Sequence, residues 1–266
     1  MSTWLDGEPL AGGVDPADRG LAYGDGLFET MALCDGRLRH EQAHHARLAL
    51  GCRRLGLPEP DETTWRKMLQ PALGDAGAGR WVIKLILTRG SGGRGYRPPG
   101  DPCPRWLVRR LPWPDYPPAW QEQGIALRYC HTRLGLNPAL AGIKHLNRLE
   151  QVLARSEWSG PEVEGLMLDL QGRVVCATQS NLFWVRDGRL HTPPIDNCGI
   201  AGITRARIMR LMPVTVTECR PETLRDADEV AVSNSLMGLV PACRLDGQRW
   251  PVGPVVRAAQ AALKRD

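Results

Sequence analysis

The 266-residue sequence has no long apolar run, and its first ten residues contain neither a basic cluster nor an apolar stretch. A membrane-spanning helix needs about 20 apolar residues, and an export signal needs a basic start followed by an apolar segment. We therefore expect neither membrane insertion nor export. The 42% hydrophobic content predicts a globular chain with one large core or two modest cores, not a disordered one.

The sequence also lacks any Cys-x-x-Cys pair, and its eight cysteines lie at irregular spacings. A chain of this length does not need disulfide bonds for stability, so we expect free thiols in a reducing cytoplasm. His40 and His44 have the i, i+4 spacing of a metal pair, but no third ligand follows at a plausible distance. We predict no metal site and expect these histidines to cap or pack a helix.

A basic run is missing as well, although the net charge is +5. Arginines are scattered among acidic residues without interleaved aromatic residues, unlike the basic patches of nucleic-acid-binding domains. Nucleic-acid binding is therefore the weakest functional hypothesis. A small anionic substrate explains the excess of positive charge equally well, and we expect such a substrate as the binding partner.

Residues 142–151, Gly-Ile-Lys-His-Leu-Asn-Arg-Leu-Glu-Gln, are the segment around which the sequence is organised. Leu146, Leu149 and Leu153 recur at helical spacing, which predicts an amphipathic helix from about His145 to residue 158. Lys144 immediately precedes this helix. Partial burial there would lower its pKa and free its amine for carbonyl chemistry, whereas an isolated lysine is normally a solvated surface cation.

Two glycine-rich segments in the first half suggest ligand contacts. Residues 24–30, Gly-Asp-Gly-Leu-Phe-Glu-Thr, permit a close backbone approach before a strand, and a helix from His40 carries Arg47. Residues 89–96, Arg-Gly-Ser-Gly-Gly-Arg-Gly-Tyr, predict a mobile basic loop after a strand. This loop either grips a carboxylate through Arg94 and Tyr96 or is a solvated turn.

The second half follows a proline-rich stretch, residues 112–118, which we interpret as a linker between α/β domains at residues 1–111 and 119–266. The later domain contains a predicted hairpin over residues 165–185. It also contains the sequence Gly-Ile-Thr-Arg at residues 202–205, where Gly202 frees the backbone and Ile203 and Thr204 open a helix. The unpaired amides at such a helix start favour a phosphate, although many helices begin this way without a ligand.

Together these motifs resemble, nearly end to end, the fold type IV family of pyridoxal-phosphate enzymes, which are the class IV aminotransferases. Residues 144–151 and 89–96 are most similar to the aminodeoxychorismate lyases within that family. The resemblance implies a mixed α/β fold of two domains like that of D-amino acid aminotransferases, pyridoxal 5'-phosphate as cofactor, and a homodimer. The later domain, residues 119–266, would carry the cofactor lysine.

The resemblance also implies a role for each matching residue. Lys144 would bind the cofactor covalently and then shuttle protons, with Thr30 beside it; Arg94 and Tyr96 would contact the substrate. The remaining cofactor-binding positions are Arg47, Cys176, Ser180, Asn181, Gly202, Ile203, Thr204 and Ser235. Among them, Cys176 occupies the position where the family normally has a glutamate that faces the pyridine nitrogen.

A neutral thiol at position 176 would keep the pyridine nitrogen protonated less well than a carboxylate does. This substitution disfavours an aminotransferase more than a lyase, because the gain of aromaticity helps to drive the elimination. The activity that the resemblance implies is conversion of 4-amino-4-deoxychorismate to p-aminobenzoate and pyruvate in folate synthesis. The alternatives are a D-amino acid or branched-chain aminotransferase and a non-catalytic protein that binds pyridoxal phosphate.

Overall fold

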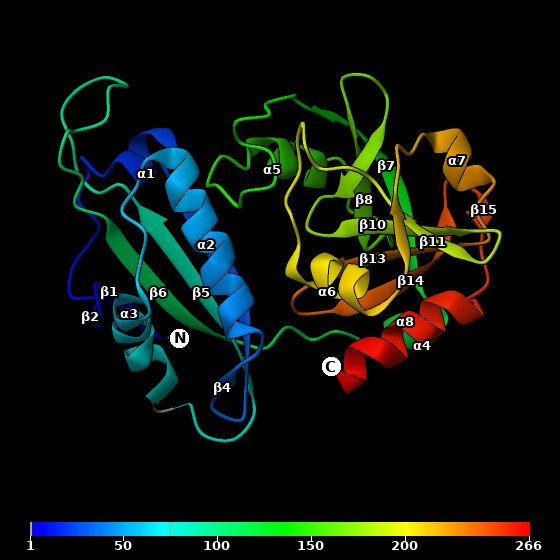
Figure 1. Cartoon of the computed structure of the whole chain (residues 1–266), viewed down its shortest axis with the longest axis horizontal. Coiled ribbons are helices and arrows are strands. Elements are labelled where there is room, and N and C mark those ends of the chain that lie inside the picture. Colours follow the sequence, from blue (N-terminus) through cyan, green and yellow to red (C-terminus); the bar gives the residue numbers. More distant parts are fainter. Residues whose placement is uncertain (1, 75) are drawn as a thin grey trace. The chain divides into compact units, whose positions relative to one another are not determined.

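The computed structural model describes residues 2–74 and 76–266, which form two compact units (Figure 1). Unit 1 comprises Met1–Pro114 and Ile143–Asn147, and unit 2 comprises Asp115–Gly142 and Arg148–Asp266. The division between Pro114 and Asp115 lies within the expected linker. The return of Ile143–Asn147 to unit 1 differs from the expected continuous domains, and it groups Lys144 with the earlier part of the chain.

Unit 1 is built on a six-stranded antiparallel sheet in the order β2-β1-β6-β5-β3-β4. Its strands are β1 (Ser2–Leu5), β2 (Glu8–Pro9), β3 (Gly26–Cys34), β4 (Arg37–Leu38), β5 (Arg80–Thr88) and β6 (Arg105–Pro112). Its helices are α1 (Arg19–Tyr23), α2 (Glu41–Leu55) and α3 (Glu62–Gly74). The strands β3 and β5 and the helix α2 confirm the elements predicted for those parts of the sequence.

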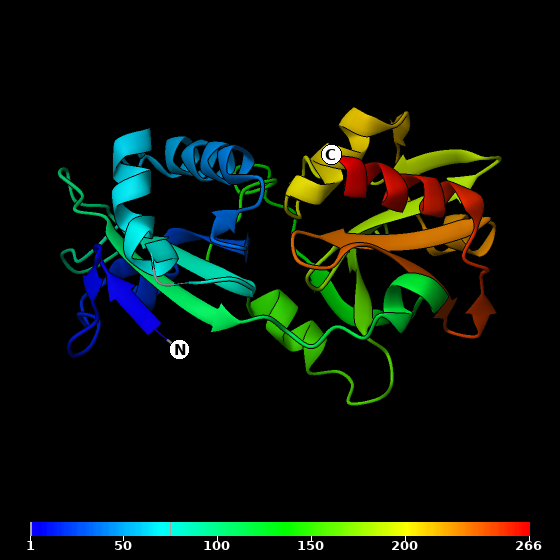
Figure 2. The same cartoon turned by 90° about the horizontal axis from the view of Figure 1, so that it is seen from below.

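The two faces of this sheet differ in burial. Strand alternation puts Leu27 and Trp106 on the face that packs against helices: Leu27 lies against Gly51 of α2, and the Trp106 ring contacts Trp65 of α3. Figure 2 shows both helices on the same side of the sheet. The opposite face, which carries Phe28, is only partly buried and is therefore available for binding.

The segment Ile143–Asn147 is extended and lies along the edge of β3, so the predicted helical start at His145 is wrong. The Phe28 amide donates to the Lys144 carbonyl at 2.9 Å, and the Leu146 amide donates to the Gly26 carbonyl at 3.0 Å. These ladder bonds occupy backbone groups that a helical turn would need. The helix α5 begins only at Leu149 (Leu149–Arg155).

The side chains of α5 also differ from the expectation. Leu149 and Leu153, assigned to a buried stripe, are 75% and 58% exposed, and Val152 is 59% exposed. The apolar spacing in the sequence is real, but this stripe faces away from the core of unit 2. An exposed apolar group of this kind typically marks an interaction surface.

Unit 2 contains a nine-stranded sheet, six strands of which close into a barrel because β9 pairs with both β8 and β10. The strands are β7 (Ile125–Leu134), β8 (Glu164–Asp169), β9 (Val174–Ala177), β10 (Asn181–Arg186), β11 (Arg189–Thr192), β12 (Val214–Val216), β13 (Glu229–Asn234), β14 (Gly238–Leu245) and β15 (Gln248–Arg249). The helices are α4 (Ala119–Gln123), α5, α6 (Ile203–Leu211), α7 (Pro221–Arg225) and α8 (Pro254–Arg265).

Alternation along β10 divides the core of unit 2. Leu182 and Trp184 pack in one cluster with residues of β7, β8 and β14, whereas Phe183 and Val185 pack in another with Ile208 of α6 and Val256 of α8. The barrel wall is therefore apolar on both sides. This rigid wall fixes the loops at its ends.

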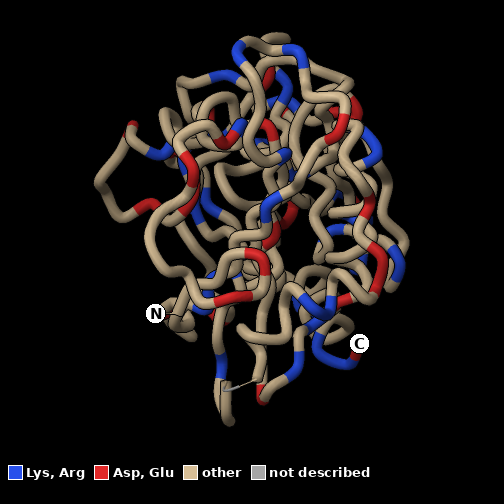
Figure 3. The backbone as a smooth tube through the Cα atoms, turned by 90° about the vertical axis from the view of Figure 1, so that its left-hand side faces the viewer, with Lys and Arg blue, Asp and Glu red and all other residues tan. Residues whose placement is uncertain are grey.

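Two global expectations concern membranes and charge. None of the described helices combines the length and the apolar character that crossing a membrane requires. Lysine and arginine are interspersed with aspartate and glutamate along the backbone (Figure 3).

Candidate functional site

Lys144 lies on the partly buried face of the unit 1 sheet. Its segment is bridged to β3 through Leu27 and His145, so the next pair, Phe28 and Lys144, points to the opposite face. The Nζ atom of Lys144 is 4.2 Å from the centroid of the Phe28 ring. Backbone pairing and an aromatic contact therefore hold this amine, as the sequence reasoning required of a reactive lysine.

Thr30, Lys84 and Arg109 form a row on the same face. Thr30 of β3 is opposite Lys84 of β5, which is opposite Arg109 of β6. The Nζ atom of Lys84 lies 3.8 Å from the Phe28 centroid. Burial lowers the pKa of Lys84 to about 8, with Arg109 acting in the same direction and Glu29 opposing it.

Sequence reasoning missed Lys84 and Arg109. A signal was available, since Lys84 interrupts an otherwise apolar central strand between Ile83 and Leu85. A lysine at such a position is seldom a solvated surface group. The strand register was needed to put it beside Thr30 and near Lys144.

Arg47 lies on the other side of the β3 strand, bound to Glu29. Its Nε and Nη2 atoms donate to the two Glu29 carboxylate oxygens at 2.7 and 2.5 Å, and the His44 Nδ1 atom is 2.7 Å from the same carboxylate. Burial raises the pKa of Glu29, but Arg47 and His44 outweigh it and bring the pKa to about 2. Glu29 is therefore a buried anion that fixes the Arg47 guanidinium.

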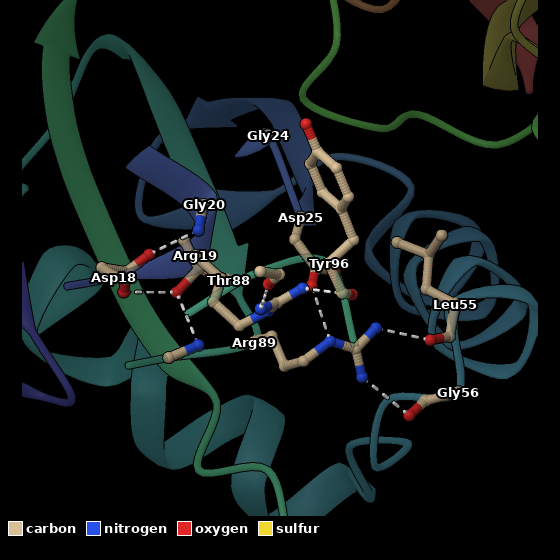
Figure 4. A network of polar contacts seen from close by, with 12 residues as sticks. Asp18, Arg19, Gly20, Gly24, Asp25, Leu55, Gly56, Thr88, Arg89 and Tyr96 are labelled. Carbon is tan, nitrogen blue, oxygen red and sulfur yellow. Dashed lines mark hydrogen bonds and ion pairs between the residues drawn. The ribbon is translucent and has the colours of Figure 1, made fainter. Parts of the chain in front are cut away.

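The glycine-rich loop at residues 89–96 is anchored by two buried arginines (Figure 4). Arg19 and Arg89 both donate through Nε to the same Asp25 carboxylate oxygen, at 2.9 and 2.8 Å. Arg89 also donates to the carbonyls of Leu55 and Gly56 at the C-terminal end of α2, at 2.6 and 3.1 Å. The start of the loop is thus tied to the helix.

Arg19 holds the other end of the loop. Its two Nη atoms donate to the carbonyls of Gly95 and Tyr96 at 3.0 and 2.9 Å, and its guanidinium lies 4.8 Å from the centroid of the Tyr23 ring. The Tyr96 ring meets Tyr23 edge to face, with centroids 5.4 Å apart, yet Tyr96 remains 85% exposed. Arg94 is also exposed. The predicted substrate loop therefore presents these side chains from a fixed backbone.

Cys176 and Asn181 lie side by side at one end of the unit 2 barrel. Asn181 is the first residue of β10 and pairs with Cys176 of β9 and Ser233 of β13, so these three side chains share one face. Burial raises the pKa of the Cys176 thiol to about 12, so the thiol is neutral. Position 176 therefore holds a small uncharged thiol where the family resemblance leads one to expect a carboxylate.

Glu164 is a buried carboxylate at the same end of the barrel that sequence reasoning did not identify. It accepts hydrogen bonds from the hydroxyls of Thr178 and Ser180, the latter at 2.8 Å, and its pKa is raised by burial despite these bonds. The Asn234 amide contacts the Ser180 Oγ atom at 3.4 Å. Glu164 therefore orients Ser180. In the sequence, the position of this acidic residue at the start of the otherwise apolar segment Gly-Leu-Met-Leu could have identified it.

The start of α6 packs directly on Asn181. The Asn181 amide donates to the Ile200 carbonyl at 2.9 Å, and a Cβ atom added to Gly202 would lie 1.9 Å from the Asn181 Oδ1 atom. The Thr204 hydroxyl donates to the Asn234 carbonyl at 2.9 Å, and Ser235 lies in the turn directly after β13. Within the described chain, no side chain caps α6 at Gly202. The amides at this helix start suit an anion.

The structure thus brings the predicted residues together as two groups, one in each unit. Thr30 and Lys144 share the partly buried face of the unit 1 sheet. Arg47 lies on the opposite face of the sheet, where it binds Glu29. Cys176, Ser180, Asn181, the start of α6 and Ser235 share one end of the unit 2 barrel. Among the described residues, no cluster of three or more histidine, cysteine or acidic side chains is arranged to hold a metal.

Comparison with known proteins identifies relatives of the whole chain. The family described as amino-transferase class IV matches residues 26–245. The aminodeoxychorismate lyase of Vibrio harveyi is 38% identical, over 98% of both chains, and the D-alanine aminotransferase of Staphylococcus epidermidis is 27% identical, over 95% of this chain and 92% of the relative. The crystal structure of 4-amino-4-deoxychorismate lyase from Pseudomonas aeruginosa is similar, with a TM-score of 0.94 and 46% identity over 99% and 98% of the two chains. These matches confirm the predicted mixed α/β fold class.

Proposed function

The chain belongs to the amino-transferase class IV family, and we propose that within it the protein is a pyridoxal-phosphate lyase that converts 4-amino-4-deoxychorismate to p-aminobenzoate and pyruvate. The observation that carries this proposal is the match, along nearly the full chain, to lyases with this substrate in their names, at 38% and 46% identity. The product p-aminobenzoate assigns the reaction to folate synthesis.

The described residues fit the proposed cofactor. The uncapped start of α6 offers amides to a phosphate, and the contact of Gly202 with Asn181 leaves no room for a side chain there. Lys144 supplies an amine that can react with an aldehyde. The residues that would hold the cofactor are Lys144, Arg47, Cys176, Ser180, Asn181, Gly202, Ile203, Thr204 and Ser235.

When bound, pyridoxal phosphate supplies an electron sink for the carbon that bears the substrate amine. Lys144 then acts as the base that takes the proton from that ring carbon on Nζ, and it returns the proton to the departing enolpyruvyl group. The products are aromatic p-aminobenzoate and pyruvate. Thr30 contributes a hydroxyl on the Lys144 face, while Arg94 and Tyr96 bind substrate, with Arg94 pairing a carboxylate.

An aminotransferase is the competing function within the family. It is less well supported, because aminotransferase relatives are 27% and 32% identical, whereas the lyases are 38% and 46% identical. The neutral thiol of Cys176 also favours the lyase, since an aminotransferase depends more on a charged partner for the pyridine nitrogen.

A homodimer in the cytoplasm is also part of this proposal. The exposed Leu149, Val152 and Leu153 of α5 supply an apolar patch for a second copy of the chain. All eight cysteines are free, which agrees with a reducing compartment. Sedimentation equilibrium of the wild-type protein and of Leu153→Glu tests the dimer: a monomeric wild type contradicts it, and dissociation of the variant supports the α5 patch.

The deciding experiment offers 4-amino-4-deoxychorismate to the loaded protein without any 2-oxo acid. Formation of p-aminobenzoate and pyruvate in equal amounts supports the lyase. Turnover only with an amino acid and a 2-oxo acid supports an aminotransferase instead. A protein that binds the cofactor but acts on neither substrate type would be a non-catalytic relative.

A further inference from the structure

Two lysine side chains of unit 1 contact one aromatic ring. The Nζ atoms of Lys84 and Lys144 lie 3.8 and 4.2 Å from the centroid of Phe28. Because two points cannot be farther apart than the sum of their distances to a third, these nitrogens are at most 8.0 Å apart. Two cations at such a separation interact appreciably at the low effective dielectric constant near protein.

The strand register explains how both amines reach the ring. Lys144 comes from the segment paired with Phe28, and Lys84 comes from β5 opposite Thr30, on the same face. Arg109 of β6 stands opposite Lys84 and adds a third positive group. This face of β3, β5 and the 143–147 segment is therefore basic where the reacting amine sits.

The acidic residue of β3 does not neutralise this face. Glu29 alternates with Phe28 and Thr30 and so points to the other side of the sheet. There its carboxylate is bound by Arg47 and His44 of α2. Its attraction for Lys84 is weaker than the effect of burial, which, with Arg109, lowers the pKa of Lys84 to about 8. Lys84 is nevertheless mostly charged at neutral pH.

We propose that Lys84 is a positioning residue that acts through Lys144: its ammonium group, held against Phe28, disfavours a proton on the Lys144 Nζ atom. An amine attacks a carbonyl carbon only in its neutral form, so Lys84 keeps a larger fraction of Lys144 reactive. This inference rests on the proposed function in one respect, since that function makes Lys144 the reacting amine.

The test compares Lys84→Met, Lys84→Arg and a control, Lys67→Met, whose side chain is exposed on α3. The full-length proteins are loaded with pyridoxal 5'-phosphate, and the visible band of the lysine-bound cofactor is followed against pH. Loss of the charge in Lys84→Met moves the midpoint of the titration upward by about one pH unit. Lys84→Arg keeps the charge and the wild-type midpoint, and so does Lys67→Met.

A second readout does not require the cofactor. Competitive acetylation of the full chain with acetic anhydride, followed by mass spectrometry, measures the free-amine fraction of Lys144 relative to Lys67. At neutral pH, Lys84→Met lowers the relative labelling of Lys144 about tenfold, and Lys84→Arg restores it. Circular dichroism of each variant shows whether it is folded.

The outcomes separate the two proposals. Unchanged Lys144 labelling and an unchanged midpoint in folded Lys84→Met overturn the role of Lys84 while the lyase function stands. An equal shift in Lys84→Arg and Lys84→Met also overturns it, because packing and not charge would then be the cause. A wild-type protein without any visible band contradicts the proposed function, and the acetylation result still decides the role of Lys84.

Discussion

Glu29 holds Arg47 by two hydrogen bonds, from Nε at 2.7 Å and from Nη2 at 2.5 Å, across the buried boundary between β3 and α2. A guanidinium bound in this way by both of its edge donors has a fixed plane and position. The arginine that the sequence suggests for phosphate binding is therefore preorganised by a neighbour on the strand that carries Phe28 and Thr30. One carboxylate therefore couples β3 to α2.

Replacement of Lys144 tests the central assignment. Lys144→Ala should reduce p-aminobenzoate formation by at least about a thousandfold, because both the covalent anchor and the proton shuttle are removed. Borohydride reduction of the loaded wild type should give a pyridoxyl adduct that peptide mapping assigns to Lys144. Lys264→Ala, near the end of α8, is the control and should keep full activity. An adduct on another lysine would refute the assignment.

Loss of the Glu29 charge should make stability less dependent on pH. The folded-state pKa of Glu29 is about 2 against an ordinary value of 4.5, so its stabilisation is complete above about pH 4.5 and disappears as pH falls toward 2. The difference corresponds to on the order of 3 kcal/mol. At pH 7, Glu29→Gln should unfold at a lower urea concentration than the wild type. On acidification, its free energy of unfolding should fall by less than that of the wild type. Exposed Glu62→Gln should change the free energy of unfolding by less than about 1 kcal/mol.

A methyl group at position 202 should disrupt the start of α6. In Gly202→Ala the new Cβ atom would lie 1.9 Å from the Asn181 Oδ1 atom, so the helix start or the asparagine must move. We expect a loss of about 1–3 kcal/mol in the free energy of unfolding and weaker retention of pyridoxal phosphate. Gly100→Ala meets nothing within 4 Å and is the matched control. Wild-type cofactor retention in Gly202→Ala would argue against a phosphate at this helix.

A carboxylate at position 176 should not improve the lyase. Cys176 is buried at the barrel end that also holds the carboxylate of Glu164, so a second acid there would be hard to ionise. We expect turnover of Cys176→Glu to stay within about tenfold of wild type or to fall, and Cys176→Ser to remain close to wild type. Steady-state kinetics provides the measurement. A hundredfold gain, about 2.7 kcal/mol of barrier, would mean that the native thiol impairs the site.

Release of the glycine-rich loop should weaken substrate binding more than it slows the chemical step. Arg19→Met removes the donors to the Gly95 and Tyr96 carbonyls, so the loop loses its fixed conformation. We expect KM for 4-amino-4-deoxychorismate to rise about tenfold with a smaller change in kcat, and Arg94→Ala to act in the same direction. Exposed Arg66→Met on α3 should alter neither constant. An unchanged KM in both loop variants would exclude this loop from substrate binding.

The sequence by itself determined the family, the fold class and the order of the motifs. Glycine-containing turns and apolar alternation are local signals, so the strands at Arg80–Thr88 and Arg105–Pro112 and the helix after Gly202 were predictable. The missing carboxylate at Cys176 was also visible, because it depends only on the distance from Asn181 along the chain.

Only the tertiary structure decided what surrounds those motifs. The pairing of Ile143–Asn147 with β3 overrode the helical spacing that begins at Leu146, since ladder bonds to a distant strand outweigh a local periodicity. The approach of Lys84 to the Phe28 ring follows from strand register, which no linear pattern reveals. Phe28 and Lys84, which are 56 positions apart along the chain, meet because the sheet aligns them, and burial then lowers the pKa of Lys84.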